Sequence, residues 1–365
     1  MEIAQEYPAP PFCPNPHCPC HRATARWRYI RAGFHHRRSE PRRIQRYRCC
    51  QCRRHFSDQT FRTSYWLKRP ELLEPLAKGL VAGSAFRQLG RSHECSPQTV
   101  ALHSGRLGRH HLLWHELTRP RDPEREPMVL DSFQSFEHSQ YSPTLFHLVG
   151  GQASHFFHGF TDSELRRSGA MSRKQKRRRA ELEARYGRPD PRSIEREVVA
   201  LLAIVLPRPA TVTLHTDEHT DYPRALARLA HLAITHRTIS SRAARTSRNP
   251  LFAVNLLDLL IRHSSANHRR ETIAFSKRRQ SAAERLWLLI VWRNFVKWFS
   301  ERRHDGTPAM RAGVATRRLT LREILARRLF VTHVTLPERW AQYYWRRVCT
   351  RRIARCREHR CRYAF

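Results

Sequence analysis

The chain has 365 residues, enough for a catalytic domain and one or two accessory modules. Its 68 Lys and Arg residues outnumber 31 Asp and Glu residues, and the formal net charge of +37 favours a polyanionic partner such as nucleic acid. The longest apolar runs, LLAIVL and LWLLIVW, are too short to span a bilayer, and the N-terminal residues lack the apolar core of a signal peptide. We therefore expect a soluble, cytoplasmic protein without a membrane partner.

Residues 1–60 predict a zinc ribbon. Cys13 and Cys18 form one close pair and Cys49 and Cys52 a second, a spacing typical of Zn²⁺ ligands in intracellular proteins. A fully coordinated Zn²⁺ replaces the hydrophobic core that so small a module cannot build. Many arginines in this segment suggest that it contacts DNA. Four further side chains are near enough to substitute as ligands: His17, Cys20, His21 and Cys50.

Residues 65–118 have the pattern of a helix-turn-helix DNA-binding domain. The predicted helices are Pro70–Leu80, Ala85–Gly90 and Gln98–His111. Ser96 followed by Pro97 is a strong start signal for the third helix, which would enter a DNA groove. The side chains expected to face that groove are Gln98, Thr99, His103 and Arg106. An ordinary helical hairpin with a solvated basic face is the alternative, and residues 119–127 are predicted to be a linker.

Residues 128–300 predict an α/β layered domain with three carboxylates on apolar elements. Asp131 interrupts a short apolar strand over Met128–Phe133, and Asp217 directly follows the strand Thr211–Thr216. Asp258 lies on the apolar stripe of a helix over Asn249–His263. Between these segments we expect two strands around Gly150-Gly151, a basic insertion over residues 166–192 and a helix over Glu195–Leu206.

Carboxylates placed in this way, in a strongly basic chain, are typical of a site for two Mg²⁺ (or Mn²⁺) ions that act on phosphodiesters. Two of these carboxylates also have an ordinary structural interpretation. Asp217 is well placed to cap a helix after its strand, and Asp258 to pair with Arg262 or Arg269.

Seven segments together resemble a known family: CPNPHC, YRCCQCRRHF, LDSFQSFEHSQYSP, TLHTDEHTDYP, NHRRETIAFSKRRQ, ERLWLLIVWRNFVK and TPAMRAG. The chain resembles bacterial insertion-sequence transposases of the DDE, RNase H-like class that begin with a zinc ribbon and a helix-turn-helix. The resemblance implies an RNase H-like catalytic core with Asp131 as the first acid and Asp217 as the second. The third acid is normally a glutamate on a following helix; here Asp258 is the best match and Glu271 the fallback.

The resemblance also implies partners and a location. The protein would bind the terminal inverted repeats of its element and target DNA, act as a dimer or larger assembly, and associate with the bacterial nucleoid. Four residues would lie near the DNA at the active site: Asn267, His268, Arg269 and Lys277. A domesticated, inactive transposase that acts as a DNA-binding regulator is the alternative. A structural RNA-binding protein would explain the charge but not the carboxylates.

Residues 301–365 predict a basic C-terminal segment with a helical run over Leu319–Phe330. Its aromatic side chains are expected to pack on the core rather than stack on bases; they are Trp340, Tyr343, Tyr344 and Trp345. The irregular spacing of the last cysteines and histidine favours free thiols over a second zinc site; these residues are Cys349, Cys356, His359 and Cys361.

Overall fold

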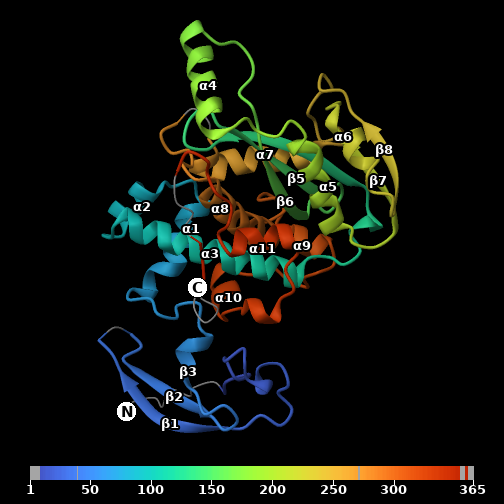
Figure 1. Ribbon diagram of the computed structural model, residues 1–365. Helices are drawn as coiled ribbons and strands as arrows, with labels where there is room; N and C mark the ends of the chain where they lie inside the picture. The colour runs from blue at the N-terminus through green and yellow to red at the C-terminus, as the bar shows by residue number, and fades with distance from the viewer. Residues whose placement is uncertain (1–8, 39, 270–271, 354–357, 361–365) are drawn as a thin grey trace.

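The computed structural model describes residues 9–38, 40–269, 272–353 and 358–360. A small antiparallel sheet at the N-terminus lies at one end of the molecule, below a larger mixed α/β body (Figure 1). This small sheet has the strand order β1-β2-β3. Its strands are β1 (Tyr29–His36), β2 (Arg43–Cys49) and β3 (His55–Ser57), with short 3₁₀ turns at η1 (Pro19–His21) and η2 (Asp58–Phe61).

The next segment forms three α-helices, as predicted, after a 3₁₀ turn η3 (Pro70–Leu72). They are α1 (Leu73–Val81), α2 (Phe86–Ser92) and α3 (Pro97–Thr118). The predicted start of the third helix is confirmed, because the Ser96 hydroxyl accepts the backbone N–H of Thr99 at 3.1 Å and Pro97 occupies the first turn. The helix continues well beyond the expected end at His111. Burial of its C-terminal half against α8 (Arg279–Val291) offsets the weak helix propensity of its histidines.

The body is built on a five-stranded mixed sheet with the order β6-β5-β4-β7-β8. Strands β4, β5 and β6 are antiparallel, whereas β7 and β8 run parallel to β4. Their bounds are β4 (Met128–Phe136), β5 (Pro143–Gly151), β6 (Phe157–Glu164), β7 (Ala210–Thr216) and β8 (Leu232–Thr238). The edge strand β8 has no counterpart among the predicted elements, because only one residue of the strand, Leu232, is buried and its apolar signal is weak.

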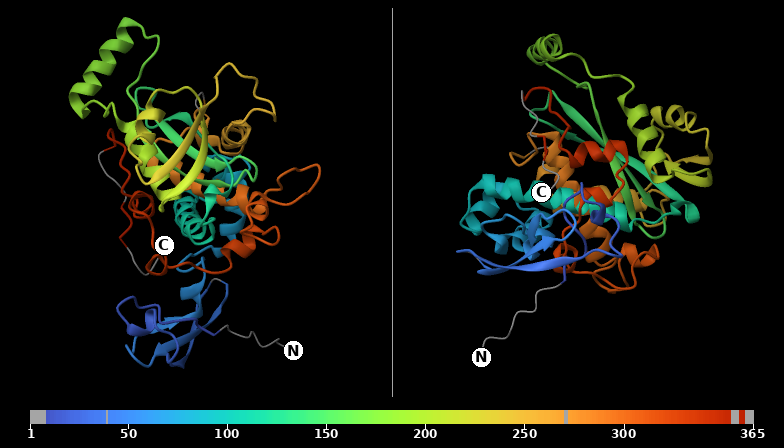
Figure 2. Two further views of the ribbon diagram at one scale, coloured as in Figure 1. Left: turned by 90° about the vertical axis from the view of Figure 1, so that its right-hand side faces the viewer. Right: turned by 60° about the horizontal axis from the view of Figure 1, so that its bottom comes forward.

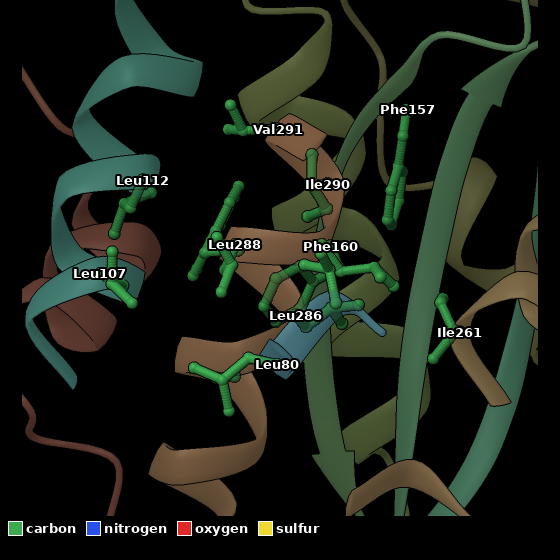
Figure 3. Packing of buried hydrophobic residues seen from close by; sticks show 14 of the residues in the cluster. Leu80, Leu107, Leu112, Phe157, Phe160, Ile261, Leu286, Leu288, Ile290 and Val291 are labelled. Atoms are coloured by element: carbon green, nitrogen blue, oxygen red, sulfur yellow. The ribbon is translucent and has the colours of Figure 1, made fainter. Parts of the chain in front are cut away.

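Side-chain alternation along β4 separates two hydrophobic clusters, one on each face of the sheet. Met128 and Leu130 pack with α5 (Ser193–Val205) and α6 (Asp221–Leu226). Val129 and Phe133 pack with α7 (Phe252–Ser264) and α8 on the other face. Figure 3 shows part of this second cluster, where side chains of the N-terminal helices, the sheet and α8 meet.

The basic insertion forms a helical arm. Helix α4 (Arg173–Tyr186) extends away from the body, as Figure 1 and the left view of Figure 2 show. Its only buried residue is Leu182, so little of the arm is fixed by the core. Its sequence RKQKRRRAELEARY gives it a strongly basic surface.

The C-terminal segment packs into the body rather than forming a separate layer. The expected helical run over Leu319–Phe330 is shorter than predicted, since only α10 (Leu321–Leu325) is α-helical there. Trp340, Tyr343 and Tyr344 are buried, which confirms the predicted packing of these aromatics. The other elements are η4 (Pro123–Arg125), η5 (Ala266–His268), η6 (Trp292–Val296), α9 (Pro308–Arg311), η7 (Val331–His333) and α11 (Glu338–Tyr344). In the part of the chain that the structure describes, no helix combines the length and apolarity needed to cross a membrane.

Candidate metal and DNA sites

The four predicted cysteines of the ribbon converge on one point. Their sulfur atoms all lie within 4.8 Å of one another, with Cys13 Sγ 3.6 Å from Cys52 Sγ and Cys18 Sγ 4.0 Å from Cys49 Sγ. Four thiolates bound tetrahedrally at about 2.3 Å from a Zn²⁺ would be separated by about 3.8 Å. The Trp27 indole N–H donates to Cys49 Sγ at 3.3 Å, the kind of contact that orients a metal ligand. The tetrad therefore fits a structural metal such as zinc.

The nearby alternatives lie outside this tetrad. The His21 ring contacts the Cys13 carbonyl and the Thr332 hydroxyl, each at 2.7 Å, so both of its nitrogens have partners. Cys50 is exposed and Cys20 is half-buried. In the described ranges, the tetrad is the one group of candidate ligands this close together. At the C-terminus, Cys349 is disulfide-bonded rather than free, and positions 356 and 361 lie outside the described residues.

Asp131 and Asp217 are brought together by parallel strand pairing. Met128 pairs with Leu214 and Val129 with His215, so the same register carried two residues further places Asp131 beside Asp217. Successive side chains along a strand point to opposite faces of the sheet. The residue before Asp131, Leu130, packs toward α5, as do Val212 and Leu214 on β7. Asp131 and Asp217 therefore lie on the opposite face, which α7 covers. Asp217 lies at the carboxyl end of β7, where its Oδ1 accepts the backbone N–H of His219 at 3.0 Å.

Asp131 has an unusual electrostatic environment. Burial raises its pKa to about 6, and the neighbouring carboxylates of Asp217 and Asp258 contribute to the rise. A hydrogen bond of 2.7 Å from the Ser132 backbone N–H and the more distant charge of Arg245 oppose it without cancelling it. Asp131 therefore interacts with each of the other two predicted acids, although the three do not form a group as tight as the cysteine tetrad.

Asp258 has a partner on its own helix. It projects from α7, which packs against β4 and β5, and Arg262 Nε lies 3.1 Å from its Oδ1. About a third of each side chain is exposed, so this is a partly solvated ion pair. Of the two partners considered from the sequence, Arg262 is the one that pairs with Asp258. The Asp258 carboxylate nevertheless helps to raise the pKa of Asp131. The fallback, Glu271, lies outside the described residues.

The residues after α7 divide into buried supports and exposed cations. Asn267 and His268 are buried, and the His268 ring packs edge-on against Phe133 and Phe146 beneath the acidic site. Neither side chain therefore contacts DNA in this conformation. Arg269 and Lys277 are exposed: Arg269 donates to two carbonyl groups at the end of α7, and the Lys277 ammonium lies over the Phe275 ring.

The expected outward orientation of His103 and Arg106 on α3 is wrong. Arg106 is buried, and its guanidinium donates to the carbonyls of Thr63 and Tyr65, each at 2.7 Å. It therefore fixes the connection between the ribbon and the helices. His103 is also buried, and its ring contacts the Thr99 carbonyl. Of the four predicted contact residues, Gln98 is exposed and Thr99 is half-buried.

Two features near the acids were not predicted from the sequence. The loop between β8 and α7 carries three exposed arginines, and the charge of one of them reaches Asp131; they are Arg242, Arg245 and Arg248. Their density in the stretch SSRAARTSRN was the available signal. On the other side of β4, the Ser132 hydroxyl contacts His147 Nδ1 at 2.8 Å and the Tyr222 hydroxyl at 3.0 Å. No local pattern indicates this contact.

A second set of buried acids in the same sheet was also missed. Asp162 on β6 lies 2.9 Å from Arg339 and 3.2 Å from Arg279, and it accepts a hydrogen bond from the Tyr343 hydroxyl. Although burial disfavours the charge, these cations lower the pKa of Asp162. Arg279 also contacts Glu137 and Glu164. The set joins β4 and β6 to α8 and α11 and leaves no carboxylate charge without a cation.

Comparison with protein-family models and with curated proteins finds no match to this chain.

Proposed function

We propose that the protein is a DDE-type transposase that binds the terminal inverted repeats of an insertion sequence and catalyses metal-dependent DNA cleavage and strand transfer. The observation that carries this proposal is the convergence of Asp131, Asp217 and Asp258 on one face of the sheet. A basic chain has many arginines available to neutralise buried acids, as Asp162 illustrates. Asp131 instead keeps a raised pKa, which is typical of a functional site.

The strand order supports an RNase H-like core for this proposal. In that fold, three consecutive antiparallel strands are followed by two strands parallel to the first, which lies at the centre of the sheet. The order β6-β5-β4-β7-β8 and its strand directions have this form. Asp131 is then on the central strand, Asp217 at the end of the adjacent one, and Asp258 on the following helix.

The carboxylates suit hard divalent cations such as Mg²⁺ or Mn²⁺. Asp131 and Asp217 would be the principal ligands; Asp258 already pairs with Arg262, so its part in metal binding depends on exchanging that partner. When bound, such ions neutralise the attacking and leaving oxygens of a phosphodiester and activate the attacking hydroxyl. The chain itself would position the substrate: the charge of Arg245 in the β8–α7 loop reaches Asp131, and this loop would hold the adjacent phosphates.

Basic surfaces elsewhere are suited to the flanking DNA. On α4, Arg173, Lys174 and Lys176 are exposed and have no carboxylate partner among the residues described. The arm would therefore contact phosphate groups without reading sequence. The exposed start of α3 and the arginine-rich ribbon would provide further contacts to the element ends. Synapsis of two such ends would require a dimer or a larger assembly.

A DNA-binding regulator derived from a transposase is the second candidate, and the Asp258–Arg262 pair favours it because it occupies a carboxylate that cleavage would need. The deciding experiment uses purified protein, end-labelled DNA from the terminus of the element, and Mg²⁺. Mg²⁺-dependent strand cleavage is the expected result. Binding with no cleavage in Mg²⁺ or Mn²⁺ would favour the regulator, and failure to bind would exclude both.

We also propose that the cysteine tetrad holds a structural Zn²⁺. Replacing Cys13 and Cys49 together with serine should release about one equivalent of zinc and unfold the N-terminal module. Metal content by atomic emission and protease sensitivity of residues 9–57 measure these two effects. Replacement of the exposed Cys50 is the matched control and should change neither. Zinc retained at full occupancy in the double variant would exclude this site.

A further inference from the structure

A groove of about 340 Å³ lies between the ribbon and the chain that leaves it. One wall comes from the ends of β1, β2 and β3, and the other from the segment after η2. The side chains on these walls are mostly cationic, imidazole or aromatic; six of them are His35, Arg37, Arg46, His55, Tyr65 and Trp66. The volume is in the range of small-molecule sites, ~300–1,000 Å³.

Trp66 is the most unusual residue of this groove. It is 78% exposed, although burial of an indole normally stabilises a protein. Its backbone has a φ of 62°, in the left-handed region that a bulky residue rarely adopts. Tyr65 packs beside it, with ring centroids 5.8 Å apart. Neither core packing nor backbone preference explains a tryptophan here, whereas a ligand that stacks on its open face would.

The charge of the groove indicates an anionic ligand. Arg46 is exposed and, within the described ranges, has no carboxylate at ion-pair distance. Arg37 is held in place by donating its Nε–H to the Pro41 carbonyl at 3.0 Å. Neither nearby acid lines the groove: Glu40 pairs with Arg42 at 3.0 Å, and Asp58 is buried and lies 3.7 Å from Arg62. A phosphate group at Arg46 would meet no carboxylate of the groove lining.

A buried amide at the groove points to the same class of ligand. Gln59 is 4% exposed and is among the lining residues, yet neither its Oε1 nor its Nε2 has a hydrogen-bond partner in the described structure. An unsatisfied buried amide is costly to keep. Both atoms are closed to solvent, so the edge of a nucleobase would supply this donor and acceptor pair only after the amide turns toward the groove.

We propose that this groove binds one unpaired nucleobase of DNA. The base stacks on Trp66, and its phosphate lies at Arg46. The inference rests on the proposed DNA-binding function and adds to it a preference for unpaired bases. Contacts to duplex phosphates require cations but no exposed aromatic ring, and paired bases keep their faces stacked inside the duplex. A groove that combines an open indole with an unpaired guanidinium therefore fits a base displaced from the duplex.

The test measures the binding of full-length, zinc-loaded protein to three fluorescein-labelled probes at fixed salt. These are a 20-base-pair duplex, the same duplex with one bulged thymidine, and a 16-nucleotide oligothymidine. Trp66→Ala should weaken binding of the bulged and single-stranded probes about ten-fold or more, because loss of one stacking contact has this size. Duplex binding should change less than two-fold. Trp66→Phe should restore most of the affinity, since it restores an aromatic face.

Matched variants separate stacking from charge and folding. Leu117→Ala removes another exposed apolar side chain, from the C-terminal end of α3, and should leave all three affinities unchanged. Arg48→Gln removes an exposed charge from the same strand as Arg46 but outside the groove, so it should weaken the three probes equally. Arg46→Gln should weaken the bulged and single-stranded probes more than the duplex.

Each remaining outcome contradicts a distinct claim. If no probe binds, the proposed DNA-binding function fails. If all probes bind and Trp66→Ala affects them equally or not at all, the groove proposal fails while DNA binding stands. If a 16-nucleotide oligouridine binds more tightly than oligothymidine and depends on Trp66, the groove is an RNA site and the proposal for DNA is overturned.

Discussion

Asp131 and Asp162 lie in the same sheet but in opposite electrostatic environments. Asp162 on β6 is fully enclosed, yet Arg279, Arg339 and the Tyr343 hydroxyl contact it, and the result is a lowered pKa. Asp131 on β4 is only partly buried. Its neighbours are a backbone N–H and two further carboxylates, the charge of Arg245 has a smaller effect, and its pKa rises to about 6. Asp162 forms ion pairs with two arginines, whereas Asp131 has no cation at ion-pair distance among the described residues.

The difference separates a structural acid from a candidate ligand. The chain has 68 Lys and Arg residues, so a cation could have been placed beside Asp131 as easily as beside Asp162. A buried carboxylate without one destabilises the protein unless something else supplies positive charge. A divalent cation at Asp131 and Asp217 would do so. The comparison therefore predicts opposite effects when each acid is replaced.

The largest effect is expected on DNA cleavage. Asp131→Asn and Asp217→Asn should each lower the rate of Mg²⁺-dependent cleavage by about 10⁴-fold, equivalent to about 5 kcal/mol, because a lost metal ligand removes charge stabilisation from the transition state. Single-turnover cleavage of labelled terminal DNA measures the rate. Binding of the same DNA in Ca²⁺ is the control and should remain within a few-fold. Cleavage that survives both replacements would show that these acids are not the metal ligands.

The next effect is on stability. Asp162→Asn should lower the free energy of unfolding by about 4 kcal/mol, since it leaves Arg279 and Arg339 enclosed with one anion fewer. Urea unfolding followed by tryptophan fluorescence measures the change. Glu71→Gln, which removes the exposed ion pair with Arg69, is the matched control and should leave the transition unchanged. A similarly small change for Asp162→Asn would remove the contrast with Asp131.

Local sequence patterns identified Asp131 as a candidate ligand but gave no indication of Asp162. Asp131 interrupts an apolar strand and Asp217 ends another, and both patterns are visible within six residues. The partners of Asp162 come from α8 and α11, more than one hundred residues further along the chain. Pairing over such a separation leaves no periodic pattern, so the structural acids were not recognised.

Contacts between distant parts of the chain also explain why Arg106 on α3 was wrongly expected to face outward. Helical periodicity places Val100 and Leu107 on one face of α3, and both side chains are buried. It could not show that the ribbon's connection would also cover Arg106, whose guanidinium binds the carbonyls of Thr63 and Tyr65. The four ribbon cysteines were predictable because two short spacings carry the whole signal.

A smaller effect of opposite sign is expected for the stability of Asp131→Asn. The fold raises this pKa from 3.8 to about 6, so the folded protein holds a proton that the unfolded chain loses between these values. The contribution of Asp131 to the stability of the unmodified protein therefore falls as pH rises through this window and is smallest above pH 6. Without divalent cations, Asp131→Asn should be more stable by up to about 3 kcal/mol at pH 8 and by little at pH 4.

Added Mg²⁺ sharpens this prediction. At pH 8 it should raise the midpoint of thermal unfolding of the unmodified protein but not that of Asp131→Asn, since only the first retains the ligand. Differential scanning fluorimetry over pH 4–8, with and without Mg²⁺, gives all of these values. If Asp131→Asn proves less stable than the unmodified protein at pH 8, the carboxylate has a structural role like that of Asp162.

The smallest effect on stability is expected at the third acid, Asp258. Its environment is intermediate between that of Asp131 and that of the buried, paired Asp162. Asp258 pairs with Arg262 in a partly exposed geometry, so Asp258→Asn and Arg262→Gln should each change the free energy of unfolding by about 1 kcal/mol or less. If Asp258 completes the metal site, Asp258→Asn should abolish cleavage, whereas Arg262→Gln should retain it because the carboxylate remains. Comparison with Glu271→Gln decides the assignment: loss of cleavage in that variant alone would transfer the role of third acid from α7 to position 271.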